Sequence, residues 1–254
     1  MSKLPEKYKF IDLSDYGRPF GRFIAKSLVH TKFTPIDVTT SFIVAGLCAV
    51  ICIYNQWFLA AALFIILKSI LDAADGELSR LKNTPSYTGR YYDSIADLLL
   101  NALILTAICH VTNGSYFLAF IAFLGLQLQG TVYNYYYVIL RTSVAGDTTS
   151  RIFENITPVA LAGESQRSVN IFYGLYVVLY RGFDKVIYFL DKEAMNGNNF
   201  PKWFMTMVSI FGLGFQLLVM AIMLVLGWAH LIIPVILVSS FLILVFIGIR
   251  KFLL

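Results

Sequence analysis

The 254-residue chain has little charge and few cysteines. Only 14% of its residues are charged, whereas 58% are hydrophobic, and its mean hydropathy is +0.71. Such a composition is too apolar for a soluble globular protein, so most of the chain must face lipid or other apolar helices. The three cysteines lie inside apolar runs and lack the spacing of a metal finger, which indicates packing residues. They are Cys48, Cys52 and Cys109.

The segment 1–33 lacks the apolar run of a signal peptide, so we expect no cleavage there. It is polar and basic instead. Between residues 15 and 30, apolar side chains fall on one side of a helix, while Arg18, Arg22 and Lys26 fall on another. This pattern predicts an amphipathic helix in the cytoplasmic interface of a membrane, with a frayed basic tail as the alternative.

Long apolar runs are the most abundant feature of the sequence. Six of them are long enough to span a bilayer as helices. They cover residues 36–54, 57–78, 90–111, 115–140, 204–227 and 230–250. The stretch 168–190 is interrupted by charges, and we expect it to form an interfacial helix within a cytoplasmic loop, 141–203, rather than a seventh span. The predicted fold is an all-α membrane protein, with a six-transmembrane-helix bundle in a domain of residues 34–254.

Positive charge fixes the expected orientation. Of the 20 lysines and arginines, seven precede residue 38, three lie between Arg80 and Arg90, and seven lie between Arg141 and Lys202. None lies in the opposite turns at 55–56, 112–114 and 228–229. Because positive charge accumulates in cytoplasmic loops, both termini are predicted to face the cytoplasm.

Four aspartates interrupt the apolar pattern where the second predicted span ends and the third begins. Residues three, four, seven and eight positions apart share one face of a helix. The first such face contains Asp72, Asp75, Gly76, Ser79 and Arg80, and the second contains Gly89, Asp93 and Asp97. The stretch 81–88, with Pro85, predicts a short break that lets the two helices return antiparallel. The four carboxylates are then expected in one pocket.

Four carboxylates in one pocket repel one another, and their burial at a membrane boundary is costly. Protons or cations must offset this cost. Ligands that are all oxygen suit hard divalent ions such as Mg²⁺, Mn²⁺ or Ca²⁺, and two helices with two carboxylates each could hold a pair of ions. Paired ions indicate phosphate chemistry.

The spacing of these residues resembles the motif of one enzyme family. The motif is Asp-x2-Asp-Gly-x2-Ala-Arg-x8-Gly-x3-Asp-x3-Asp, and it marks the CDP-alcohol phosphotransferases, which are integral membrane enzymes. The chain matches it at every spacing, with Ser79 where the family usually has Ala. Serine is nearly as small as alanine, so close approach of a ligand is preserved.

The resemblance implies a role for each motif residue. Asp72, Asp75 and Asp93 would be the principal ligands of Mg²⁺ or Mn²⁺, and Asp97 would bind a second ion or act as a base. The small residues would leave room for cytidine and ribose, and the planar fork of Arg80 would face the diphosphate. These small residues are Gly76, Ser79 and Gly89. The segment 34–37 resembles the Thr-Pro-Asn sequence that opens the first span in the family, which makes Asp37 either a nucleotide contact or a helix cap.

Three features outside the motif are candidates for binding the acceptor. Lys68 lies one turn deeper in the membrane than Asp72 and is expected either to pair with carboxylates, to receive an acceptor phosphate or to snorkel. Arg141 and Arg151 follow the fourth span, where some family members bind an acceptor phosphate. The tyrosines at 133 and 135–137 either stack on a cationic headgroup or pack between helices.

The resulting expectation is transfer of a phospho-alcohol unit from a CDP-linked donor to a hydroxyl acceptor, with release of CMP, in membrane phospholipid synthesis. Chain length and span count favour CDP-diacylglycerol as donor, and CDP-choline or CDP-ethanolamine acting on a diacylglycerol-like lipid is the alternative. A divalent-cation transporter is the alternative of another class. The resemblance also implies a homodimer among membrane lipids, and no nucleic-acid partner is expected.

Overall fold

The computed structural model describes residues 4–144, 153–154, 156–196 and 200–254, and these residues form helices and connecting segments without a strand. The α-helices are α1 (Arg18–Leu28), α2 (Pro35–Tyr54), α3 (Phe58–Lys82), α4 (Tyr87–Val111), α5 (Tyr116–Ser143), α6 (Gln166–Leu190), α7 (Lys202–Val208), α8 (Leu213–Val225), α9 (Ile232–Ser240) and α10 (Leu242–Leu253). The all-α expectation is therefore confirmed.

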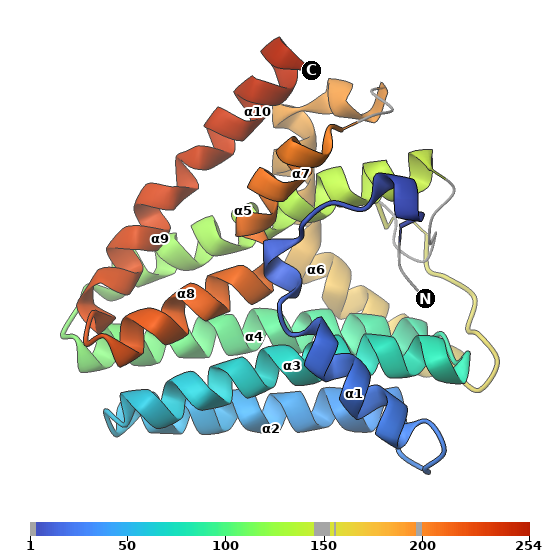
Figure 1. Cartoon of the computed structure of the whole chain (residues 1–254), viewed down its shortest axis with the longest axis horizontal. Coiled ribbons are helices and arrows are strands. Elements are labelled where there is room, and N and C mark those ends of the chain that lie inside the picture. The colour runs from blue at the N-terminus through green and yellow to red at the C-terminus, as the bar shows by residue number, and fades with distance from the viewer. Residues whose placement is uncertain (1–3, 145–152, 155, 197–199) are drawn as a thin grey trace.

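The helices pack in two groups (Figure 1). In one group α2, α3 and α4 lie side by side, α8 covers α3, and α1 crosses α3 near one end of the bundle. In the other group α5 packs against α9 and α6, and α6 also contacts α4. Buried apolar side chains from α2, α3, α4, α5, α8 and α9 form the main core. This arrangement packs α1 against the second half of α3, which contains the first two motif aspartates.

Local sequence signals define the ends of the helices around the predicted pocket. Thr34 caps α2, and Asp37 at the third helical position completes a capping box with it. The helix α3 ends at Asn83, which adopts a left-handed conformation with φ of 52°. Ser86 then caps α4 by accepting a hydrogen bond from the Gly89 N–H at 2.8 Å. The predicted break at 81–88 is therefore real but shorter, and α3 and α4 return antiparallel.

Among the described residues, four helical segments are long and apolar enough to cross a membrane, and a bent pair makes a fifth candidate. The four are Pro35–Tyr54, Tyr87–Val111, Tyr116–Ser143 and Ala229–Leu253. The helix α3 has 25 residues, but charged residues at 68, 72 and 75 interrupt its apolar run, so it does not count among them. The multi-span expectation thus holds for four to five segments, and the count of six stays a prediction.

The predicted span 204–227 corresponds to the bent pair, Lys202–Phe211 with Leu213–Val225, which is the fifth candidate. α7 with the 3-10 turn Ser209–Phe211 meets α8 at an angle of 53°. Residues of the N-terminal segment lie in the bend: the Leu13 N–H donates to Ser209 Oγ at 3.0 Å. A Cβ atom at Gly214 would lie 1.9 Å from the Ser14 carbonyl oxygen, so a larger residue would exclude that segment. The bend is therefore a place where distant parts of the chain are in contact.

The helix α6 is not among the segments that pass as candidate spans. Its Tyr180 hydroxyl donates to the Ser94 carbonyl of α4 at 2.6 Å. Near its end, the buried carboxylate of Asp191 pairs with Arg250 of α10 and accepts from the Tyr136 hydroxyl of α5 at 2.7 Å. These contacts fix α6 against α4, α5 and α10, and its placement at the interface stays a prediction.

Candidate functional site

Three of the four motif aspartates come together between α3 and α4. Asp72, Asp75 and Asp93 each offer a carboxylate oxygen, and these oxygens all lie within 4.8 Å of one another. Asp75 is buried, whereas Asp72 and Asp93 are partly exposed. Asp72 and Asp75 lie in the second half of α3 and Asp93 lies in the second turn of α4, on either side of the short segment that joins the two helices.

The donor chemistry of this cluster fits a hard divalent cation. The Thr39 hydroxyl of α2 donates to Asp75 Oδ2 at 2.6 Å and so fixes the orientation of that carboxylate. Asp93 Oδ1 is buried and has no hydrogen-bond partner among the described residues. A buried, unpaired carboxylate oxygen beside two further carboxylates is costly without a positive charge. The cluster therefore has the ligands, and one open acceptor, that Mg²⁺ or Mn²⁺ would take.

The fourth aspartate has a different environment. Asp97 forms an ion pair with Lys68, whose side chain is fully buried in α3. The Lys68 ammonium also lies 5.0 Å from the centre of the Phe42 ring. Lys68 therefore pairs with a carboxylate and does not snorkel, and Asp97 lies outside the group of three oxygens. Its proposed metal and base roles stay predictions, as does acceptor binding by Lys68.

The arginine of the motif lies over its glycine. A Cβ atom at Gly76 would lie 3.6 Å from Arg80 Nη1, so the guanidinium covers the space that glycine leaves free. Arg80 Nη2 pairs with Glu77 Oε1 at 3.2 Å, and the buried Nε of Arg80 has no partner among the described residues. An unpaired buried N–H is available to a ligand oxygen.

The remaining nucleotide candidates have local roles in the fold. Ser79 Oγ donates to the Thr84 carbonyl at 3.0 Å beyond the end of α3. Gly89 lies in the first turn of α4 against its cap, Ser86. Asp37 accepts from the Thr34 N–H at 2.8 Å, so it is the third-position partner of the capping box, in which Thr34 is the N-cap. Contact of these residues with a nucleotide stays a prediction.

The remaining candidates for binding the acceptor were predicted in α5 and in the segment after it. Arg141 is buried, with its guanidinium 5.6 Å from the centre of the Tyr137 ring. Arg151 lies outside the described residues. The tyrosines pack within the protein: Tyr133 bonds to Asp12, and the Tyr135 hydroxyl donates to the Asp191 carbonyl at 2.9 Å. These contacts favour helix packing over recognition of a headgroup for Tyr133 and Tyr135.

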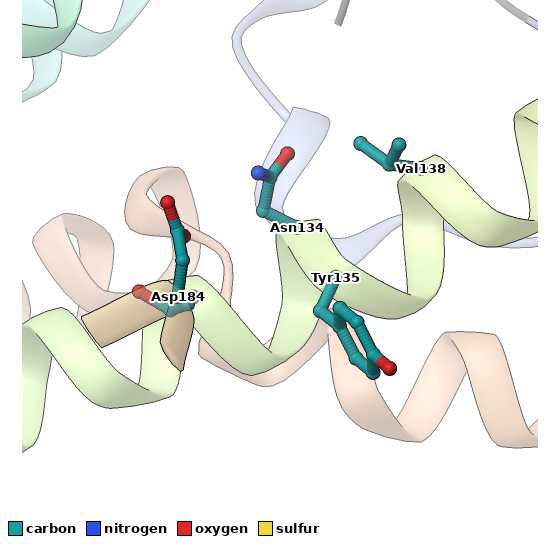
Figure 2. Close-up of a pocket in the computed structure, with 5 residues that line it drawn as sticks. Asn134, Tyr135, Val138 and Asp184 are labelled. Carbon is teal, nitrogen blue, oxygen red and sulfur yellow. The ribbon is translucent and has the colours of Figure 1, made fainter. Parts of the chain in front are cut away.

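Two cavities lie away from the aspartates. A water-sized one of about 10 Å³ is bordered by α5 and α6, where Figure 2 shows Asn134, Tyr135 and Val138 of α5 beside Asp184 of α6. A larger one of about 330 Å³ is lined by α6 and by residues 153 and 154. Neither includes a motif residue, so the chemistry of the aspartates, and not cavity shape, identifies the site.

Four residues lie close to the site although the sequence did not predict them as site residues. Thr39 and Tyr16 lie outside the motif, and the buried Tyr16 hydroxyl is beside Ser69 and near Lys68 and Asp72. Glu77 and Arg22 form an ion pair between α3 and α1. Glu77 is not on the helix face that carries the motif residues. In the sequence, the basic residues spaced along α1 were the only indication that a carboxylate of another helix could pair with them.

The fold is a helical bundle with several helices apolar enough to span a membrane. It holds a cluster of three carboxylates between α3 and α4. These two features together indicate a membrane protein with a candidate divalent-cation site. The family model described as CDP-alcohol phosphatidyltransferase matches residues 33–180, which include α2, α3, α4, α5 and most of α6. The chain belongs to this family, as its motif predicted. No curated protein shows a significant match to the chain.

Membership of the family defines the class of activity. The protein is a transferase of substituted phosphate groups, and the family supports transfer of a phospho-alcohol unit from a CDP-alcohol to a hydroxyl acceptor. Together with the long apolar helices, it indicates a multi-pass membrane protein in lipid biosynthesis.

Proposed function

We propose that the protein transfers a phosphatidyl group from CDP-diacylglycerol to a small polar alcohol and releases CMP. One observation carries the proposal: the oxygens of Asp72, Asp75 and Asp93 lie within 4.8 Å of one another, at motif positions of this family. Arg80, with its unpaired Nε, follows on the same helix and supplies a fixed positive charge for the diphosphate.

We further propose that the three aspartates hold Mg²⁺ or Mn²⁺, with Asp97 contributing to a second ion or acting as the base. Divalent cations at this position would neutralise charge on the diphosphate and orient its phosphorus for in-line attack. The orientation of Asp75 by Thr39 supports this assignment. Gly76, Ser79 and Gly89, which have small or no side chains, are the proposed contacts for cytidine and ribose, and Asp37 is a further nucleotide contact.

In the proposed reaction, the oxygen of the acceptor hydroxyl attacks the phosphorus that carries the diacylglycerol, and Asp97 accepts the proton of that hydroxyl. A new P–O bond forms, and the bond to the bridging oxygen breaks, so CMP leaves with that oxygen. Arg80 donates hydrogen bonds to diphosphate oxygens throughout. Lys68 orients the Asp97 carboxylate by pairing with it, and Lys68, Arg141 and Arg151 are the candidates for contact with a phosphate on the acceptor.

We propose six transmembrane spans, with both termini and the site facing the cytoplasm. Four to five apolar segments support this topology, and α3 would be a further span whose charged residues are those of the site. The absence of Lys and Arg from the turns at 55–56, 112–114 and 228–229 supports the orientation. The segment 1–33 would lie at the interface beside the membrane domain, 34–254, and we propose that two copies of the protein form a homodimer.

A donor-by-acceptor screen tests this function. Purified protein in detergent is incubated with CDP-diacylglycerol, CDP-choline or CDP-ethanolamine, with candidate alcohols and with Mg²⁺ or Mn²⁺, and CMP release is measured. We expect release with CDP-diacylglycerol, loss of it with a chelator, and loss of it in Asp93→Asn and Asp97→Asn. Release only from a CDP-aminoalcohol with a diacylglycerol acceptor would replace the proposed donor.

Transport assays test the alternative of another class. Protein in vesicles loaded with a metal-sensitive dye is exposed to Mn²⁺, and dye quenching is recorded. Metal flux without any CMP release would identify a divalent-cation transporter. Near-normal turnover by Asp97→Asn would show that Asp97 is not the base.

A further inference from the structure

Glu77 is a buried carboxylate surrounded by three arginines. Its side chain is 4% exposed. Glu77 Oε1 lies 3.2 Å from Arg80 Nη2, 3.3 Å from Arg22 Nε and 3.8 Å from Arg18 Nε. Arg80 is on the same helix, whereas the other two arginines come from α1. One carboxylate thus joins the motif arginine to the N-terminal helix.

Around Glu77, guanidinium groups outnumber the carboxylates with which they pair. Arg18 also pairs with Asp15 at 2.5 Å, so three guanidinium groups meet two carboxylates. Arg80 uses Nη2 for Glu77, and its buried Nε stays without a partner among the described residues. When one N–H group of the planar guanidinium is bound by a carboxylate, the remaining N–H donors point in a fixed direction. Glu77 therefore occupies the position from which it can aim Arg80.

The helix α1 is held close enough to α3 to supply this cluster. A Cβ atom at Gly21 would lie 2.9 Å from the Ala74 nitrogen and 3.0 Å from the Ala73 carbonyl carbon. These two alanines separate Asp72 from Asp75. A Cβ at Gly17 would lie 3.3 Å from the Ser69 carbonyl oxygen. The backbone of α1 therefore contacts the backbone of the motif itself.

We propose that Glu77 is a positioning residue for the CDP donor: it fixes Arg80 toward the diphosphate and is itself held by Arg22 and Arg18 of α1. This proposal rests on the proposed function, because it assigns the diphosphate to Arg80. The ligand class is a nucleoside diphosphate or its ester. The N-terminal helix is then part of the donor site, beyond its expected place at the membrane surface.

The variant Glu77→Gln tests this role, because it keeps the size of the side chain and removes its charge. We expect KM for the CDP donor to rise about tenfold, as for loss of a charge-assisted hydrogen bond, while KM for the acceptor changes less than about twofold. Glu6→Gln is the matched control, since it removes the charge from an exposed pair with Lys9 and should leave both constants unchanged. Equal changes in both KM values in Glu77→Gln would overturn the proposal.

Nucleotide binding separates this proposal from the proposed function. Binding of CDP and of CMP is measured with Mn²⁺ present, by calorimetry on wild type and Glu77→Gln. We expect the variant to weaken CDP binding about tenfold and CMP binding much less, because CMP lacks the second phosphate. If wild type releases no CMP from any donor, the proposed function fails, but this comparison still decides the role of Glu77. Equal CDP affinity in the two proteins would overturn it.

Arg22 provides a second, independent variant. Arg22→Gln should weaken CDP binding in the wild-type background and have no additional effect in Glu77→Gln, because both changes break the same contact. Strictly additive effects would show that Arg22 does not act through Glu77 and would overturn the proposed chain from α1 to Arg80.

Discussion

The Lys68 ammonium and the Asp97 carboxylate form an ion pair inside the bundle, where the lysine side chain is fully buried. Removal of one partner from a buried pair leaves the other charge uncompensated, which typically costs about 3–5 kcal/mol. We expect Lys68→Met to lower the unfolding temperature in detergent and to reduce CMP release. The double variant Lys68→Met/Asp97→Asn should recover most of the unfolding temperature but not the activity. An unfolding temperature of Lys68→Met equal to that of wild type would show that the ion pair does not stabilise the fold.

The hydrogen bond from Thr39 to Asp75 should set the affinity for the metal. Loss of an outer partner of a metal ligand typically costs about 10–100-fold in affinity. Thr39→Val keeps the shape of the side chain and removes the donor, so the Mn²⁺ concentration for half-maximal activity should rise within that range. Thr40→Val is the control, since the Thr40 hydroxyl donates to the Ile36 carbonyl of its own helix. Equal effects of the two variants would argue against a metal on Asp75.

The contact of Gly21 with α3 predicts an unusual response to alanine. Alanine normally stabilises a helix relative to glycine by about 1 kcal/mol. Gly21→Ala should instead lower both the unfolding temperature and the activity, because its Cβ would meet the Ala73–Ala74 backbone at 2.9–3.0 Å. Gly174→Ala in α6 has no atom within 4 Å of the new Cβ and should melt at or above the wild-type temperature. A neutral Gly21→Ala would show that α1 moves away from α3 without cost.

Glu164 predicts a pH dependence of stability. Its partial burial raises the pKa, but hydrogen bonds from the Ser86 hydroxyl and from the Thr88 and Tyr87 N–H groups outweigh burial and hold the pKa below its usual 4.5. A carboxyl with a lowered pKa stabilises the folded state above the pKa of the unfolded chain and loses this effect as the pH falls through the lower, folded value. Glu164 should therefore fix the start of α4 near neutral pH.

The measurement compares unfolding temperatures of wild type and Glu164→Gln across pH. The difference should be constant above about pH 5 and should shrink as the pH falls below about 4.5, where the glutamate is protonated. Glu193→Gln, which removes a carboxylate at an exposed site, is measured alongside as the control. A difference that grows toward acid would reverse the sign and contradict the assignment.

Much of the fold was predictable because it depends on local patterns. Apolar runs placed α2, α4 and α5 within a few residues of their observed ends, and Pro85 with the polar residues around it located the turn between α3 and α4. The aspartate cluster followed from helical spacing together with this turn. These features need only the residues within one or two helical turns.

The rest depends on contacts between distant segments, which periodicity does not record. At the bend between α7 and α8, Ser14 lies against Gly214, and nothing near position 214 indicates which segment approaches it. Glu77 acquires its neighbours from α1, and Thr39 reaches Asp75 from α2. The sequence therefore predicted that these carboxylates would cluster, but it did not predict the residues from other helices that contact them.

The position of the N-terminal segment also constrains the order of assembly. The Leu13 N–H bonds to Ser209, which lies 196 residues later in the chain. During synthesis α1 can dock on α3 early, but the residues before α1 must wait for the bend between α7 and α8. We expect the contact between the N-terminal segment and this bend to form last, after the first four long helices have packed together.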